Sequence, residues 1–155
     1  MNKARKFFLT LGYSGLSPKA PGTIGSVVAL LLGMAILQVA QISTLFMLAL
    51  LISVVSVKQI DIYEKEVGEH DGKEIVIDEL AGMWIAMGIA NCTSDNWILA
   101  IIAFIYFRAF DILKPSIIGK IDRDVKGGWG VMGDDMLAGF FAGLATSMTY
   151  FVLFT

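Results

Sequence analysis

Five long apolar runs dominate this chain and restrict it to helical architectures. Charged residues lie between the runs rather than within them, and the runs are too long for strands. They cover Ile24–Ala40, Ile42–Val57, Leu80–Ala90, Trp97–Phe107 and Met136–Phe154. With 56% hydrophobic residues and a mean hydropathy of +0.72, the 155-residue chain is too apolar for an ordinary soluble domain. We therefore expect one all-α domain, residues 1–155, forming a polytopic membrane helical bundle of about five helices.

The basic residues are distributed unequally between the two ends of these runs. All 12 Lys and Arg fit on one side of a bilayer, while the connections on the other side, Gln38–Ser43 and Asn91–Asn96, contain none. Membrane proteins retain Lys and Arg on the cytoplasmic side. We therefore expect the N-terminus, the charged loops and the active site at the cytoplasmic membrane surface, and the C-terminus outside.

Two of the runs are shorter than a bilayer crossing, which needs about 20 residues. Leu80–Ala90 and Trp97–Phe107 cross only if Ile75–Glu79 and Arg108–Leu113 extend their helices, and that brings charge toward the bilayer. A re-entrant third segment and a soluble bundle of very apolar helices are the alternatives. Ionisable residues at membrane depth are candidates for function.

Several classes of protein are excluded by composition. The net charge of −2 and the absence of a basic helix argue against a nucleic-acid partner. The single Cys92 excludes an internal disulfide and a multi-cysteine metal site, and no removable signal peptide is evident. Gly139 and Gly143 form a pair of small residues that we expect to pack inside the bundle, although a homo-oligomer stays open.

Three polar stretches contain the candidate chemistry, and the first is Gly15–Ser26. Its glycines and prolines allow close approach of the backbone to a ligand, and it leads into a helix N-terminus whose free N–H groups suit phosphate. Thr23 and Ser26 add hydroxyl donors. Either residue could instead simply cap the helix.

The second stretch is His70–Glu79. Asp78 and Glu79 are adjacent in the expected first turn of a helix, where the helix dipole alone stabilises carboxylates. Adjacent side chains point about 100° apart, so only one need face a shared metal directly. His70 is either a surface residue or a ligand.

The third stretch begins at Phe107. Arg108, Asp111 and Lys114 recur at three-residue spacing and share one helical face. A carboxylate near a helix C-terminus opposes the dipole, so helix propensity does not explain Asp111. This spacing is compatible with two roles: the three residues could form a structural ion-pair triad, or they could together bind a metal or a phosphate.

The same stretch continues through Asp122–Asp124 to a second acidic pair. We expect Gly127–Gly130 to form a flexible loop, after which Asp134 and Asp135 open the last helix. Capping of that helix is the simplest explanation for the pair.

Taken together, these stretches place several carboxylates and several cations on one membrane face. Carboxylates so gathered repel one another unless a cation bridges them, and oxygen ligands without cysteine indicate Mg²⁺ rather than zinc or copper. Arg and Lys beside such a metal bind phosphate groups. The residues therefore indicate phosphoryl-group chemistry on a membrane lipid or lipid-linked phosphate, with the reaction left open.

Four motifs in one order resemble the phosphatidylglycerophosphatase A family over nearly the whole chain. They are Gly-Leu-Ser-Pro-x-x-Pro-Gly-Thr-x-Gly-Ser (15–26), His-Asp (70–71) with Val-x-Asp-Glu-x-x-Gly-Met-Trp (76–84), Phe-Arg-x-x-Asp-x-x-Lys-Pro (107–115) and Asp-Arg-x-Val-x-Gly-Gly-x-Gly-x-Met-x-Asp-Asp (122–135). The resemblance implies an integral, Mg²⁺-dependent phosphatase of the inner membrane, and the multi-pass arrangement is expected from the hydropathy of this chain. Such an enzyme hydrolyses the phosphomonoester of phosphatidylglycerophosphate to phosphatidylglycerol, a step of phospholipid biosynthesis.

Site residues follow from these motifs. The expected metal-binding and catalytic residues are Asp78, Glu79, Asp111, Asp134 and Asp135. The expected substrate-binding residues are Thr23, Ser26, His70, Arg108, Lys114 and Arg123. Gly72–Glu74 is given no functional weight. Attack by water and attack by a carboxylate through an aspartyl-phosphate both stay open.

Two other functions remain as alternatives. A CDP-alcohol phosphatidyltransferase also uses clustered Asp and Mg²⁺, but its Asp-Gly is closely followed by Ala-Arg, whereas Asp71-Gly72 precedes Lys73-Glu74 here. A non-enzymatic Mg²⁺ transporter would need polar residues along a path across the bilayer, and the far half holds only Asp95.

Overall fold

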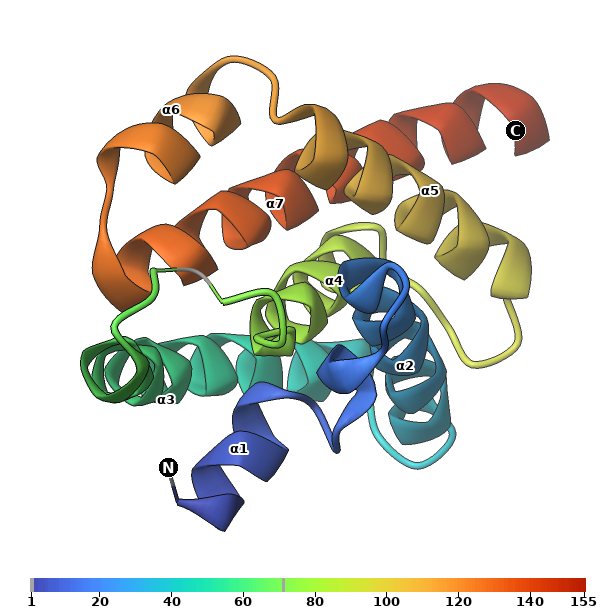
Figure 1. Cartoon of the computed structure of the whole chain (residues 1–155). Helices are drawn as coiled ribbons and strands as arrows, with labels where there is room; N and C mark the ends of the chain where they lie inside the picture. The colour runs from blue at the N-terminus through green and yellow to red at the C-terminus, as the bar shows by residue number, and fades with distance from the viewer. Residues whose placement is uncertain (1, 71) are drawn as a thin grey trace.

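The computed structural model describes residues 2–70 and 72–155, and this part of the chain is helical with no strand (Figure 1). The all-α prediction is confirmed. The elements are α1 (Lys3–Leu9), a short 3-10 helix η1 (Ser14–Leu16), α2 (Pro21–Leu37), α3 (Ile42–Val67), α4 (Ile77–Ile89), α5 (Trp97–Leu113), α6 (Ile117–Asp124) and α7 (Gly127–Phe154). Helices α2, α3, α4, α5 and α7 correspond to the five apolar runs, although Ile24–Ala40 continues past the end of α2 and Leu80–Ala90 past the end of α4. Helices α1 and α6 were not predicted from hydropathy.

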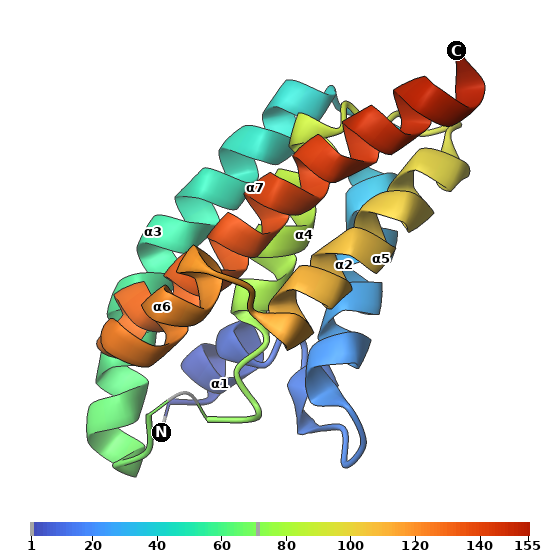
Figure 2. The same cartoon turned by 90° about the horizontal axis from the view of Figure 1, so that it is seen from above.

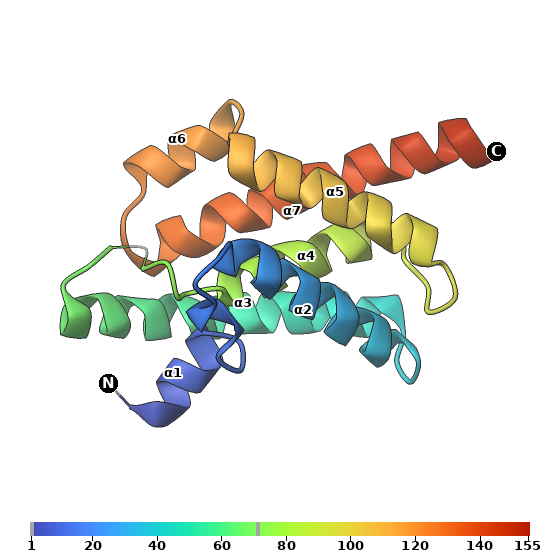
Figure 3. The same ribbon diagram turned by 45° about the vertical axis from the view of Figure 1, so that its right-hand side comes forward.

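Helix α4 forms the centre of the bundle. It packs against α2, α3, α5 and α7, which Figures 2 and 3 show arranged around it. Every residue from Ile77 to Met87 is buried, so this short helix is apolar because protein surrounds it on all sides. The first turn of α4 contains Asp78 and Glu79, as expected for a helix start.

Helices α4 and α7 approach so closely that their backbones touch. A Cβ atom on Gly139 would overlap the carbonyl oxygen of Gly82, and one on Gly82 would lie 2.6 Å from the carbonyl oxygen of Asp135. A Cβ atom on Gly143 would lie 2.6 Å from the Cβ of Ile89. The prediction that Gly139 and Gly143 pack inside the bundle is therefore confirmed.

The outer surface of the bundle is unusually apolar. Large apolar side chains on the outward faces of α2, α3, α5 and α7 are exposed, among them Met47 at 67% and Met148 at 70%. Soluble monomers rarely expose contiguous apolar surface of this extent. Helices α3 and α7 are long and apolar enough to cross a membrane, and α2 is a shorter apolar helix.

The expected boundaries need two corrections near the last helix. Gly127–Gly130 is not a loop, because α7 already begins at Gly127. The Gly128 N–H donates to Asp61 Oδ1 of α3 at 2.6 Å, and a Cβ atom on Gly128 would overlap the backbone of Val57. These glycines therefore permit close contact with α3. Asp134 and Asp135 consequently lie inside α7 and do not cap it.

Candidate active site

Three helices bring five acidic side chains into one buried cluster. Asp78 and Glu79 come from the first turn of α4, Asp111 from the end of α5, and Asp134 and Asp135 from α7. All five are buried. They lie around a cavity of about 280 Å³ whose lining residues are Gly22, Lys73, Ile75, Asp78, Glu79, Asp111, Ile112, Lys114, Asp134 and Asp135. The carboxylates chosen from separate stretches of sequence therefore meet in space.

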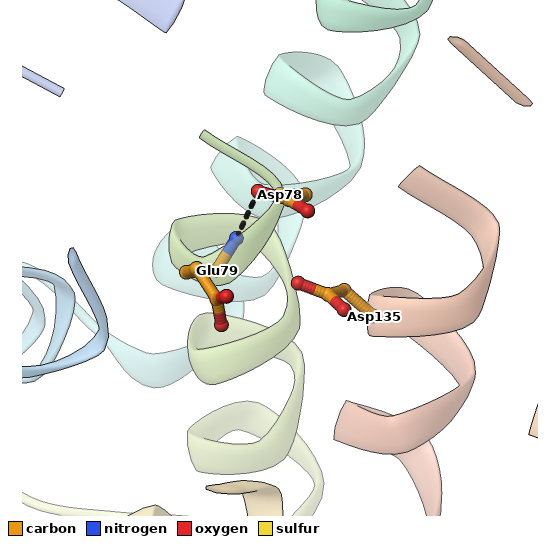
Figure 4. Close-up of side chains that lie close together, drawn as sticks. All are labelled: Asp78, Glu79 and Asp135. Carbon is orange, nitrogen blue, oxygen red and sulfur yellow. Dashed lines mark hydrogen bonds between the residues drawn. The ribbon is translucent and has the colours of Figure 1, made fainter. Parts of the chain in front are cut away.

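Asp135 occupies the centre of this cluster. One oxygen from each of Asp78, Glu79 and Asp135 lies within 4.8 Å of the others, and Asp111, Asp134 and Asp135 form a second such group. Figure 4 shows the first group, with the Asp135 side chain of α7 directed toward the start of α4. Asp135 thus belongs to both groups.

The geometry of the cluster fits a divalent cation. The Oδ2 atom of Asp135 is buried and has no hydrogen-bond partner within the described residues. A buried carboxylate oxygen left without a partner among other carboxylates is unfavourable unless a cation satisfies it. The donors are all carboxylate oxygens, which are the ligands that Mg²⁺ prefers.

Arg108 supplies positive charge on one side of the cluster. Its guanidinium donates to Glu79 Oε2 at 3.0 Å, to Asp111, and to Thr23 Oγ1 at 3.3 Å. One side chain of α5 thereby connects α2, α4 and the end of its own helix. Arginine suits this position because its planar guanidinium offers several donors in a fixed arrangement.

Lys114 supplies positive charge on the other side. Its Nζ atom lies 2.6 Å from Asp134 Oδ2, 3.5 Å from Asp111 Oδ1 and 3.6 Å from Asp122 Oδ1. Burial opposes the charged form, but the hydrogen bond to Asp134 and the surrounding negative charges raise the pKa of Lys114 overall. The ammonium group therefore stays protonated. Even so, Arg108 and Lys114 are two cations facing five carboxylates.

Thr23 and Ser26 take a different role from helix capping. The N-cap residue of α2 is Ala20, so the capping interpretation of both hydroxyls was wrong. The Ser26 hydroxyl lies 2.8 Å from the carbonyl oxygen of Gly22 and 3.1 Å from Glu79 Oε2, while Thr23 accepts a hydrogen bond from Arg108. The start of α2 therefore orients two charged side chains of the site, Glu79 and Arg108.

Two of the expected substrate-binding residues lie elsewhere. His70 Nδ1 is 2.7 Å from Glu64 Oε1, and Arg123 is exposed on α6 beside Asp124. Neither lines the cavity, and their substrate-binding role stays a prediction. Asp71, the other half of the His-Asp motif, lies outside the described residues.

Lys73 was missed by the sequence reasoning. It was given no functional weight, yet it lines the cavity. It is exposed, and no ion pair to it is found in the described part of the chain. The sequence offered one indication of a role for Lys73: it is the basic residue that most closely precedes Asp78.

Comparison with known proteins identifies one family. The family model for phosphatidylglycerophosphatase A matches residues 7–150. Proteins named phosphatidylglycerophosphatase A from Escherichia coli (strain K12) and Haemophilus influenzae are 37% and 36% identical to this chain, over 93% and 86% of it and 81% and 82% of their own lengths. A Bacteroides thetaiotaomicron protein provisionally named phosphatidylinositol-3-phosphatase is 34% identical over 90% of this chain and 89% of its own length. No solved structure matches.

Proposed function

Because this chain belongs to the phosphatidylglycerophosphatase A family, we propose that it hydrolyses the phosphomonoester of phosphatidylglycerophosphate, releasing phosphate and phosphatidylglycerol. The observation that supports this most directly is the convergence of five buried carboxylates and Lys114 around one cavity, with Arg108 bonded to two of these carboxylates, Glu79 and Asp111. The family match favours this activity over the transferase and transporter alternatives. Residues 1–155 are proposed to act as one domain.

The proposed cofactor is Mg²⁺. Asp78, Glu79 and Asp135 would hold one ion, and Asp111, Asp134 and Asp135 offer a second set of ligands. A bound Mg²⁺ would supply positive charge to the phosphate oxygens and polarise the phosphorus centre.

The side chains around the carboxylates are proposed to position the phosphate. Arg108 and Lys114 would donate charge-assisted hydrogen bonds to phosphoryl oxygens and stabilise the charge that develops as the ester bond breaks. Ser26 and Thr23 keep Glu79 and Arg108 oriented. In the overall reaction, the oxygen of a water molecule replaces the glycerol oxygen on phosphorus, and that glycerol oxygen leaves as a hydroxyl.

The activity is tested by phosphate release from phosphatidylglycerophosphate with purified protein in detergent. We expect release that depends on Mg²⁺, falls at least about a thousandfold with a chelator, and returns when Mg²⁺ is added back. Phosphatidic acid and phosphatidylinositol 3-phosphate serve as comparison substrates, and we expect slower release from both. Faster release from either would assign a different substrate, and no release from any would contradict the proposal.

The protein is further proposed to be a multi-pass protein of the inner membrane with its active site on the cytoplasmic side. The starts of α2, α4 and α7 and the ends of α3 and α5 lie at one end of the bundle (Figure 2). That arrangement is compatible with five alternating crossings and with the unequal distribution of basic residues. At 13 residues, α4 is about 20 Å long, but it contacts protein rather than lipid.

Single cysteines test this orientation after the native Cys92 is replaced. An impermeant maleimide added to intact spheroplasts should label Asp95→Cys and Thr155→Cys, because both positions are exposed at the far end. The exposed Lys126→Cys should react only after the membrane is permeabilised. Labelling of Lys126→Cys in intact spheroplasts would reverse the topology and move the active site to the outer face.

A further inference from the structure

A second, apolar hollow lies next to the proposed active site. This groove has a volume of about 460 Å³ and lies where α5, α6 and α7 meet. Its lining residues are Phe110, Pro115, Ser116, Ile117, Ile118, Phe141, Leu144, Ala145 and Met148. Ser116 provides the only polar side chain in this set. We call this hollow the α5–α7 groove.

The groove and the catalytic cavity are adjacent along the connection from α5 to α6. Asp111 and Lys114 line the cavity, while Phe110 and Pro115, their neighbours in sequence, line the groove. Lys114 also reaches Asp122 of α6 at 3.6 Å. Its ammonium group therefore lies close to the boundary between the charged and the apolar hollow.

The connection from α5 to α6 has an unusual backbone conformation. Lys114 and Ser116 have φ angles of 47° and 51°, in the left-handed region that residues other than glycine rarely adopt. Pro115 between them has a ring-restricted φ angle. The segment between the residues that line the cavity and those that line the groove therefore has a backbone conformation that few sequences adopt.

Helix α7 links the two hollows along one face. Asp134, Phe141 and Met148 recur at seven-residue spacing and lie on the same side of the helix. At 1.5 Å per residue, Phe141 and Met148 are about 10 Å and 21 Å beyond Asp134 along the axis. In the proposed orientation the groove begins near the level of the carboxylates and extends toward the bilayer interior.

We propose that the α5–α7 groove seats an acyl chain of the lipid substrate while the phosphomonoester occupies the carboxylate cavity. This assignment rests on the proposed function. The substrate joins a charged head group to hydrocarbon chains, and the protein has a charged cavity and an apolar groove lined by neighbouring residues of the α5–α6 connection. A substrate bound in both would keep its chain in apolar surroundings while its phosphate reaches buried side chains.

The expected contribution of the groove is positioning rather than affinity. An acyl chain that leaves the bilayer for the groove exchanges one apolar environment for another, so little free energy is gained. A seated chain does limit where the phosphate can lie relative to Asp134 and Lys114. Misplacement of reacting atoms by about 1 Å can reduce a rate by about a hundredfold.

Leu144→Trp tests the assignment because it fills the groove from a side chain that is 42% exposed. The matched control is Leu50→Trp. Leu50 is 37% exposed and lines another apolar groove, of about 450 Å³, to which α5 and the Lys114–Ser116 connection contribute no residue. Each variant is assayed on two substrates, dioleoyl and dibutanoyl phosphatidylglycerophosphate. The dibutanoyl substrate is the reference, because its short acyl chains cannot fill the groove.

We expect Leu144→Trp to lower the ratio of kcat/KM for dioleoyl over dibutanoyl substrate by about tenfold or more. Leu50→Trp should leave that ratio unchanged. The acyl-chain assignment would be overturned if Leu144→Trp left the ratio unchanged, including by an equal loss on both substrates. It would also be overturned if Leu50→Trp lowered the ratio as much as Leu144→Trp does. The groove would then bind bulk lipid only. Wild-type protein that hydrolyses neither substrate would instead contradict the proposed function, and the groove assignment with it.

Discussion

Asp135→Asn is expected to reduce phosphate release by about a thousandfold or more while the protein stays folded. Asp135 is 2% exposed and is the one residue shared by both groups of carboxylates that can hold a cation. The amide keeps the shape of the side chain but removes its charge and one ligand oxygen. Steady-state kinetics on phosphatidylglycerophosphate measure the loss.

Thermal unfolding separates a lost ligand from a damaged fold. Without divalent cations, Asp135→Asn removes one of several mutually repelling buried charges, so we expect its Tm to equal or exceed that of the wild type. Saturating Mg²⁺ should raise the Tm of the wild type and not that of the variant, because a ligand stabilises only the state that binds it. Asp124→Asn, on the exposed face of α6, is the matched control and should behave as wild type. Near-normal turnover in Asp135→Asn, or a retained Mg²⁺-dependent rise in Tm, would move the metal site elsewhere.

Arg108→Lys is expected to reduce activity by about a hundredfold even though the charge is retained. The guanidinium reaches Glu79, Asp111 and Thr23 together, and a single ammonium group cannot reproduce that span. Arg108→Ala should be worse for a different reason. Loss of this buried partner leaves Glu79 without its ion pair and Asp111 with Lys114 alone, and it costs about 3–5 kcal/mol in the free energy of unfolding.

The pair of variants distinguishes catalysis from folding at Arg108. Arg108→Lys should show its main effect in kcat/KM, whereas Arg108→Ala should also lower Tm. Arg5→Lys is the control, because Arg5 pairs with the half-exposed Glu66 and does not line the cavity, and such pairs contribute little. If Arg108→Lys had activity within about twofold of wild type, the planar arrangement of several guanidinium donors would not be needed for the reaction.

Much of the helix order and the carboxylate set could be predicted because both depend on local signals. Apolar runs mark helices, and Asp111 was informative because it opposes the dipole of its own helix. The beginning of α7 could not be predicted in the same way. Gly127–Gly130 is helical because its backbone packs on α3 and Gly128 donates to Asp61, and neither contact is visible in the local sequence.

The substrate-binding set shows a similar limit. His70 and Arg123 belong to the motifs but do not line the cavity, whereas Lys73, in a stretch given no weight, does line it. The roles of Thr23 and Ser26 depend on the start of α2 lying beside α4 and α5. Proximity to a motif in sequence is therefore an unreliable guide to proximity in a bundle whose helix ends meet from distant parts of the chain.

The backbone contact between Gly82 and Gly139 also bears on how such an enzyme can diversify. Because α4 and α7 touch without intervening side chains, the separation between Asp78, Glu79 and Asp135 is fixed by main-chain geometry, and any larger residue at either glycine would shift the carboxylates apart. Substitution of Gly82 or Gly139 is therefore not a route to a new head-group preference. A substitution at Lys73, which is exposed and lines the cavity, would alter what the cavity admits without disturbing the proposed catalytic residues.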